Sequence, residues 1–334
     1  MRLVLIVLLV VFHSLIIYGG GWEHPEGYVD IPLYGSLAGW TYSFMLESFT
    51  FISGYVWLYA SLNGGGNLYH LIKKKSKRLL VPMLVFGLLY FICFMEYQTI
   101  GGAVYDVLNG AGHLWYLPML FWCFVEAWIL KQIKIDERIK LIGVALLAIF
   151  CSEFPIPFRI ATSFYYLFFF YLPVLFVGKR EVVYKKVMGE PRGILTTAWI
   201  AFIAAYLLIK YILHTPLPTE GLPIVNKFMV LSLNKALQLV YSTLGVSAFY
   251  LTGVALSGTS DLTAKDTLLV KLGSYCFGVY IFQQFVLKEL YYNTNIPGVV
   301  GPYLLPWIGV VLALVISFVL TYLIRFTKVG RGLL

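Results

Sequence analysis

Two ionisable side chains stand inside apolar segments of the sequence that are long enough to cross a membrane. His13 lies in MRLVLIVLLVVFHSLIIY, and the ten residues between Arg2 and His13 are nine aliphatic residues and one aromatic residue. Glu47 lies in a second segment, WTYSFMLESFTFISGYVWLY. Burying an ionisable group in a membrane costs free energy, so such residues indicate a functional site. An imidazole oriented by a carboxylate is suited to act as a general base, and we predict that both residues are catalytic.

The two side chains are predicted to lie at a similar depth. Helix geometry places His13 about 16 Å from Arg2. Glu47 falls about 10 Å below Trp40, and therefore about 20 Å from the inner face of a ~30 Å apolar core. Consecutive helices usually pack as neighbours, so a His13–Glu47 pair can form. A hydrogen-bonded pair with a purely structural role is the alternative interpretation.

A cationic run, KKKSKRLLVP, enters the third apolar segment. Lys75 and Arg78, together with Arg2, could hold the phosphates of an anionic cofactor. Arg78 is the strongest candidate of the run, because it directly precedes the apolar residues LLVPML. Orientation of the chain by positive charge, or contact with anionic lipids, is the alternative interpretation of the same run.

His113 opens the fourth apolar segment, in GHLWYLPMLFW. His113, Trp115 and Tyr116 could bind a substrate by stacking on a sugar and by hydrogen bonding to a hydroxyl group. Aromatic residues at the membrane–water interface give the competing interpretation of Trp115 and Tyr116.

The composition identifies the elements that must position these residues. The chain has 334 residues, of which 60% are hydrophobic and 12% are charged, about half the charged fraction of a soluble domain. It therefore reads as an all-α polytopic membrane protein forming a single transmembrane domain over residues 1–334. About ten transmembrane helices are predicted, over residues 3–18, 40–61, 79–97, 113–130, 139–152, 161–178, 194–212, 231–257, 272–290 and 303–325.

The basic residues predict the orientation of these helices. Loops 62–78, 131–140, 179–193 and 258–271, with Arg2 and the C-terminal tail, hold 20 of the 25 lysines and arginines. Three of the intervening loops, 19–39, 98–112 and 291–302, hold none. Basic loops face the cytoplasm, so both termini are predicted to be cytoplasmic. The net charge of +9 follows from this pattern and requires no nucleic-acid partner.

Two further features have simple interpretations. A signal peptide over residues 1–20 is the alternative to a first membrane helix, but a histidine in the apolar region and the lack of an A-x-A site argue against it. The four cysteines stand singly in or beside apolar segments and have no metal-binding or disulfide spacing, so no metal is predicted.

Taken together, these motifs resemble the family-3 membrane acyltransferases, which O-acylate carbohydrates. Arg2, ten residues and His13 are similar to the start of that family, and Glu47 stands six residues before Ser53-Gly54, as an acidic residue does there. The basic run followed by Arg78-Leu79-Leu80-Val81-Pro82 and the sequence His113 to Leu117 also resemble it. Ser274 with Gly278-Val279-Tyr280-Ile281 resembles its late motif, but that motif often continues to a histidine where this chain has Gln283-Gln284.

The resemblance implies a membrane O-acyltransferase of the bacterial inner membrane. It implies an acyl-CoA donor, with acetyl-CoA expected first, whose phosphates lie near Arg2, Lys75 and Arg78. It also implies a glycan acceptor that enters past His113 and Trp115, with His13 as the base and Glu47 as its support. Direct transfer and an acyl-histidine intermediate are both compatible with these residues.

Two other functions stay open at this point. A transporter or flippase for a glycan or a lipid-linked sugar would also keep ionisable groups near the midplane, although the inverted repeats typical of transporters are not visible. A non-catalytic receptor or scaffold would need neither His13 nor Glu47. The expected partners are the bilayer and the glycan acceptor; a homodimer and association with polysaccharide-synthesis machinery are both compatible with the sequence.

Overall fold

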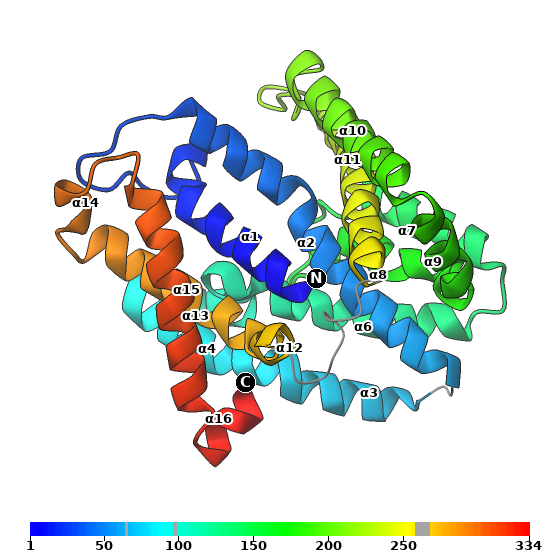
Figure 1. Cartoon of the computed structure of the whole chain (residues 1–334), viewed down its shortest axis with the longest axis horizontal. Coiled ribbons are helices and arrows are strands. Elements are labelled where there is room, and N and C mark those ends of the chain that lie inside the picture. The colour runs from blue at the N-terminus through cyan, green and yellow to red at the C-terminus, as the bar shows by residue number, and fades with distance from the viewer. Residues whose placement is uncertain (64–65, 96–98, 258–267) are drawn as a thin grey trace. The chain divides into compact units, whose positions relative to one another are not determined.

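The computed structural model describes residues 1–63, 66–95, 99–257 and 268–334 (Figure 1). Within these ranges the regular elements are all helices, which confirms the predicted all-α class. The described residues form two compact units: unit 1 lies within residues 1–45, 77–116 and 261–334, and unit 2 within residues 46–76 and 117–260. The single domain expected over residues 1–334 stays a prediction.

Unit 1 contains the first helix, the start of the second and most of the C-terminal helices. Its elements are α1 (Arg2–Leu15), η1 (Ile16–Gly19), the first part of α2 (Pro32–Ala60), α4 (Val81–Phe94), α5 (Ile100–Leu108), η4 (Gly112–Trp115), α12 (Leu268–Gly273), α13 (Cys276–Tyr292), α14 (Ile296–Val299), α15 (Leu305–Ile324) and α16 (Lys328–Leu333).

Unit 2 contains the remainder of α2 and the central helices. Its elements are η2 (Ser61–Asn63), α3 (Leu68–Lys75), α6 (Tyr116–Gln132) apart from Tyr116, which belongs to unit 1, α7 (Glu137–Phe150), α8 (Ile160–Tyr171), η5 (Leu172–Leu175), η6 (Val177–Lys179), α9 (Arg180–Gly189), α10 (Pro191–Leu207), η7 (Leu208–Ile212) and α11 (Ile224–Ser257). A π-helical stretch, η3 (Ser76–Leu80), joins α3 to α4, so the chain is helical from Leu68 to Phe94.

Three helices form the core of unit 1. α1, α13 and α15 pack against one another in all three pairs, and α4 contacts α13, α5 and η4 (Figure 1). The long aliphatic run of α1 has neither glycine nor proline, and the helix gives way to η1, which ends at Gly20 in the left-handed conformation with φ +72°. This packing places one face of α1 in the interior of unit 1.

A helix lies over each of the ten predicted membrane segments. In the described part of the chain, seven helical stretches are long and apolar enough to cross a membrane. The chain is therefore a multi-pass membrane protein. The other three predicted segments correspond to α2, α7 and α13. α7 and α13 have 14 and 17 residues, shorter than a full span. The count of ten and the cytoplasmic termini stay predictions.

Several segments expected to be loops are helical instead. α3 lies in the expected loop 62–78, α5 in 98–112, α9 in 179–193 and α14 in 291–302. Hydropathy detects apolar length, whereas α3 and α5 begin at side-chain caps: Asn67 accepts a hydrogen bond from the Tyr69 amide, and Thr99 accepts one from the Gly102 amide. Most of the expected loop 258–271, including Lys265, lies outside the described residues.

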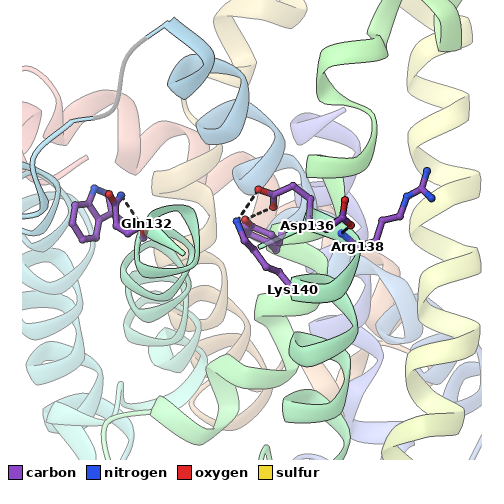
Figure 2. Close-up of polar contacts among 7 residues, drawn as sticks. Gln132, Asp136, Arg138 and Lys140 are labelled. Atoms are coloured by element: carbon purple, nitrogen blue, oxygen red, sulfur yellow. Dashed lines mark hydrogen bonds and ion pairs between the residues drawn. The ribbon is translucent and has the colours of Figure 1, made fainter. Parts of the chain in front are cut away.

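The connection between α6 and α7 illustrates how the basic residues are accommodated (Figure 2). Asp136 caps α7 by accepting a hydrogen bond from the Arg138 amide at 2.8 Å. Lys140, expected in loop 131–140, is instead buried on α7, and its Nζ pairs with Glu137 Oε1 at 2.8 Å. Tyr171 donates to the other carboxylate oxygen at 2.6 Å. The pairing with Glu137 offsets the charge of the buried lysine.

Gly54 lets α2 approach α8 closely within unit 2. A Cβ at this position would collide with the backbone of Phe170. Small residues of this kind allow membrane helices to pack against each other. We therefore expect Gly54→Ala to lower the free energy of unfolding by about 1–3 kcal/mol, because the backbones must separate.

The measurement is the thermal unfolding midpoint of the purified protein in detergent. Gly143→Ala is the matched control, since Gly143 is exposed on α7 and has open space around it. Equal midpoints for the two variants would contradict the close α2–α8 packing.

Candidate functional site

His13 lies on the buried face of α1. Its neighbours on that face, Leu5, Ile6, Leu9 and Val10, are almost completely buried, and His13 itself is 6% exposed. The helical period of 3.6 residues puts these side chains on the side of α1 that packs against α13 and α15. The imidazole is therefore held in the core of unit 1.

Two rings from outside α1 flank the imidazole of His13. The ring of Trp22 is nearly parallel to it, at 8°, with the centroids 6.3 Å apart. The ring of His113 approaches edge-on, at 70°, with the centroids 6.2 Å apart. The structure thus brings His113 next to His13, whereas the sequence placed it at the outer end of a different helix. Two imidazoles and an indole form the centre of the site.

Residues of the late sequence motif hold His113 in place. Its Nε2 lies 3.0 Å from the Ile281 carbonyl oxygen, and Tyr280 donates a hydrogen bond to the His113 carbonyl at 2.7 Å. Because a carbonyl oxygen can only accept, Nε2 carries the proton of the neutral ring and Nδ1 presents a lone pair. Gly278 lets α13 pack closely against α15, since a Cβ there would overlap Thr321.

The turn before His113 depends on Gly112. Its φ is +56°, and a Cβ at this position would collide with the ring of Tyr90. Glycine adopts this left-handed conformation without a steric penalty. Tyr90 also donates a hydrogen bond to Gln284 Oε1 at 3.1 Å, so the turn, α4 and α13 fix the position of His113 together.

Several buried polar atoms at this centre lack hydrogen bonds. Nδ1 of His13, Nδ1 of His113 and both amide atoms of Gln283 have no hydrogen-bond partner among the described residues. Gln283 is 0% exposed, and its side chain interacts with His13. Unpaired buried polar groups are costly, and such a cluster is typical of a site that pairs with a substrate.

Ser14 anchors α1 beside this centre. Its hydroxyl donates to the Pro306 carbonyl on α15 and lies 2.6 Å from the Tyr291 hydroxyl on α13. Tyr291 in turn donates to the Ser14 carbonyl at 2.9 Å. These bonds fix the rotation of α1 at the residue next to His13.

The beginning of α1 carries a second group of candidate residues. Arg2 and Arg78 are close enough for their charges to interact, and Tyr116 lies near Arg2. Within the part of the chain that the structure describes, no carboxylate forms an ion pair with either arginine. Two exposed guanidinium groups without an acidic partner can bind an anion. Two of the three expected cofactor-binding residues are therefore brought together.

The other expected residues have different surroundings. Glu47 belongs to unit 2 and is 1% exposed; Tyr165 donates a hydrogen bond to its Oε1 at 3.1 Å. Lys75 also belongs to unit 2, with its Nζ 3.4 Å from the centroid of the Phe124 ring. The His13–Glu47 pair and the role of Lys75 stay predictions.

The aromatic residues expected to bind substrate differ in exposure. Trp115 is partly buried, and Tyr116 is buried with its ring 6.2 Å from that of Tyr280. Their role in substrate binding stays a prediction. No group of three His, Cys, Asp or Glu side chains within the described ranges could hold a metal ion.

Sequence reasoning missed Trp22 and gave Gln283 no part in the site. Trp22 follows three glycines in a segment without regular periodicity, so nothing in the sequence placed it over His13. Gln283 was noted only as the residue that replaces an ionisable one. The available signal in the sequence was the pair of amides Gln283-Gln284 within an apolar segment.

Comparisons with known proteins bear on this site. A family model described as an acyltransferase domain, that of the family-3 acyltransferases, matches residues 1–326 and so covers His13, His113 and Gln283. No curated protein and no solved structure matches the chain.

Proposed function

Because the chain belongs to the family-3 acyltransferases, we propose that it transfers an acyl group from cytoplasmic acyl-CoA to a hydroxyl group of a cell-surface or exported glycan. The acyl group expected first is acetyl, and the expected location is the bacterial inner membrane. The observation that supports this reaction is the buried imidazole of His13 beside that of His113, in a cluster of buried polar atoms that have no hydrogen-bond partner among the described residues. No observation favours a transporter.

In the proposed reaction, His13 acts as the general base. Its ring nitrogen accepts the proton of the acceptor hydroxyl as the hydroxyl oxygen attacks the thioester carbonyl carbon. The carbon–oxygen bond forms, the carbon–sulfur bond breaks, and the imidazolium returns the proton to the departing CoA thiolate. The products are the O-acylated glycan and CoA, and His13 regains its neutral state.

His113 positions the acceptor in this proposal. Its Nε2 is committed to the Ile281 carbonyl, so Nδ1 is the nitrogen that can accept a hydrogen bond from a sugar hydroxyl. Trp22, parallel to the ring of His13, offers an apolar face on which a sugar ring can stack. Trp115 and Tyr116 are proposed to contribute further contacts with the glycan.

The donor phosphates are proposed to lie at the start of α1. Arg2 and Arg78 form a cationic pair there, and the guanidinium geometry suits bidentate contacts with phosphate. Ten residues of helix separate Arg2 from His13, a rise of about 16 Å, which an extended pantetheine arm can follow. Lys75 is proposed as a further cation for the donor, and Glu47 as the support of the imidazole.

The test uses the purified full-length protein in lipid nanodiscs with radiolabelled acetyl-CoA. We expect saturable binding, slow release of free CoA in water, and faster release with label on the sugar when a panel of bacterial oligosaccharides is added. Absence of saturable binding of acetyl-CoA and of longer acyl-CoAs would contradict the proposal. Glycan movement across the membrane without label transfer would instead support a transporter.

A further inference from the structure

We propose that Gln283 is the positioning residue of His13: its amide oxygen accepts a hydrogen bond from Nδ1 and leaves Nε2 as the nitrogen that accepts the substrate proton. This inference rests on the proposed function and concerns the same site. It adds a neutral amide in unit 1 to Glu47, the support of the imidazole that is proposed above.

The first argument is the burial of both partners. Gln283 is 0% exposed and His13 is 6% exposed. Neither the amide of Gln283 nor Nδ1 of His13 makes a hydrogen bond with another described residue. Leaving a buried donor or acceptor unpaired costs about 1–3 kcal/mol. Because one side chain needs an acceptor and the other offers one, pairing them removes both costs.

The second argument is proximity. His13 on α1 and Gln283 on α13 come from helices in direct contact, and their side chains interact. The terminal torsion of glutamine rotates in a broad well, so the amide oxygen can turn toward Nδ1 at little cost. Hydrogen bonds between catalytic groups are often poorly aligned without substrate and shorten when it binds.

The third argument is that the other ring beside His13 already has a partner. His113 uses its Nε2 for the Ile281 carbonyl, two residues before Gln283 on the same helix. One segment of α13 would then hold both imidazoles, His113 through a backbone carbonyl and His13 through a side-chain amide. The two rings would present opposite nitrogens to the substrate, Nε2 of His13 and Nδ1 of His113.

Other titratable groups near α1 must be considered in any pH measurement. The ring of His113 lies edge-on to that of His13. On α13, Tyr291 is bonded to Ser14 and Lys288 lies over the ring of Trp22. Three further titratable side chains lie on elements that pack against α1: Tyr322 on α15, Lys271 on α12 and Tyr18 on η1. All of these groups are unchanged in the variants below.

The test compares Gln283→Met and Gln283→Glu with the wild type. Methionine keeps the length of glutamine but cannot accept from Nδ1, so we expect kcat for CoA release to fall about tenfold with KM for acetyl-CoA unchanged. Glutamate restores the acceptor and favours the protonated imidazole, so we expect activity to return and the acid limb of the pH–rate profile to move up by about one unit.

A second measurement does not depend on turnover. Nitrogen-15 NMR of labelled histidines, with His13 assigned by comparison with His13→Ala, reports which ring nitrogen carries the proton. We expect Nδ1 to be protonated in the wild type and a mixture of the two neutral forms in Gln283→Met. Gln132→Met, at an exposed position at the end of α6, is the matched control for the loss of an amide (Figure 2).

The outcomes separate this inference from the proposed function. If His13→Ala loses turnover but Gln283→Met keeps kcat within twofold of the wild type, the positioning role is wrong and the acyltransferase site stands. If the wild type shows no acetyl-CoA turnover, the proposed donor is wrong and the NMR measurement alone decides on Gln283. An Nδ1 proton that is unaffected by Gln283→Met would overturn the inference in either case.

Discussion

His13→Ala is expected to abolish measurable acyl transfer from acetyl-CoA while the protein still folds and inserts in the membrane. Loss of a general base typically lowers the rate by 10²- to 10⁴-fold. The fold should tolerate the change, because alanine is a good helix former and Ser14 still anchors α1 to α13 and α15. The measurement is CoA release and label transfer, with acetyl-CoA binding determined on the same sample.

Two further variants make this result specific. His13→Gln keeps a polar side chain of similar size without a basic nitrogen, so it should be as inactive as His13→Ala. His70→Ala removes an exposed histidine on α3 and should transfer at the rate of the wild type. Transfer by His13→Ala within twofold of the wild type would rule out His13 as the base, whereas loss of acetyl-CoA binding would point to misfolding.

The sequence predicted the helices better than it predicted the neighbours of His13. Hydrophobic length and the ionisable residue within it were enough to locate α1 and to single out His13. His113 opens the fourth apolar segment, so nothing in the sequence related it to His13 in the interior of the first. The structure instead places the His113 ring 6.2 Å from the His13 ring, because Gly112 and the late motif on α13 set the preceding turn.

The remaining partners could not be read from the sequence for a physical reason. Helical periodicity shows which residues share a face, but not which other helix covers that face. Trp22 comes from an irregular segment, and Gln283 comes from a helix 270 positions further along the chain than His13. Glu47 was identified as buried, but its described partner, Tyr165 on α8, is an uncharged residue among many aromatic ones.

Arg78→Gln and Arg2→Gln are each expected to raise KM for acetyl-CoA about tenfold with kcat little changed. A hydrogen bond to a charged group contributes about 1.5–3 kcal/mol, and 1.4 kcal/mol corresponds to tenfold in affinity. The phosphates lie far from the reacting carbonyl, so their contacts stabilise the bound donor and the transition state equally. Steady-state kinetics at two ionic strengths provides the measurement, since added salt should weaken donor binding in the wild type more than in the variants.

The same contact can be removed from the donor instead of the protein. Acetyl-pantetheine carries the thioester without the CoA phosphates, so its KM should be the same in the wild type and in both arginine variants. Arg138→Gln, at an exposed position on α7, controls for the loss of a positive charge elsewhere (Figure 2). If Arg78→Gln raised KM for acetyl-pantetheine as much as KM for acetyl-CoA, the role of the arginine would be to stabilise the packing of the helices. If only acetyl-CoA were affected, the unpaired guanidinium groups at the start of α1 would be the phosphate site, at one end of the helix whose interior carries His13.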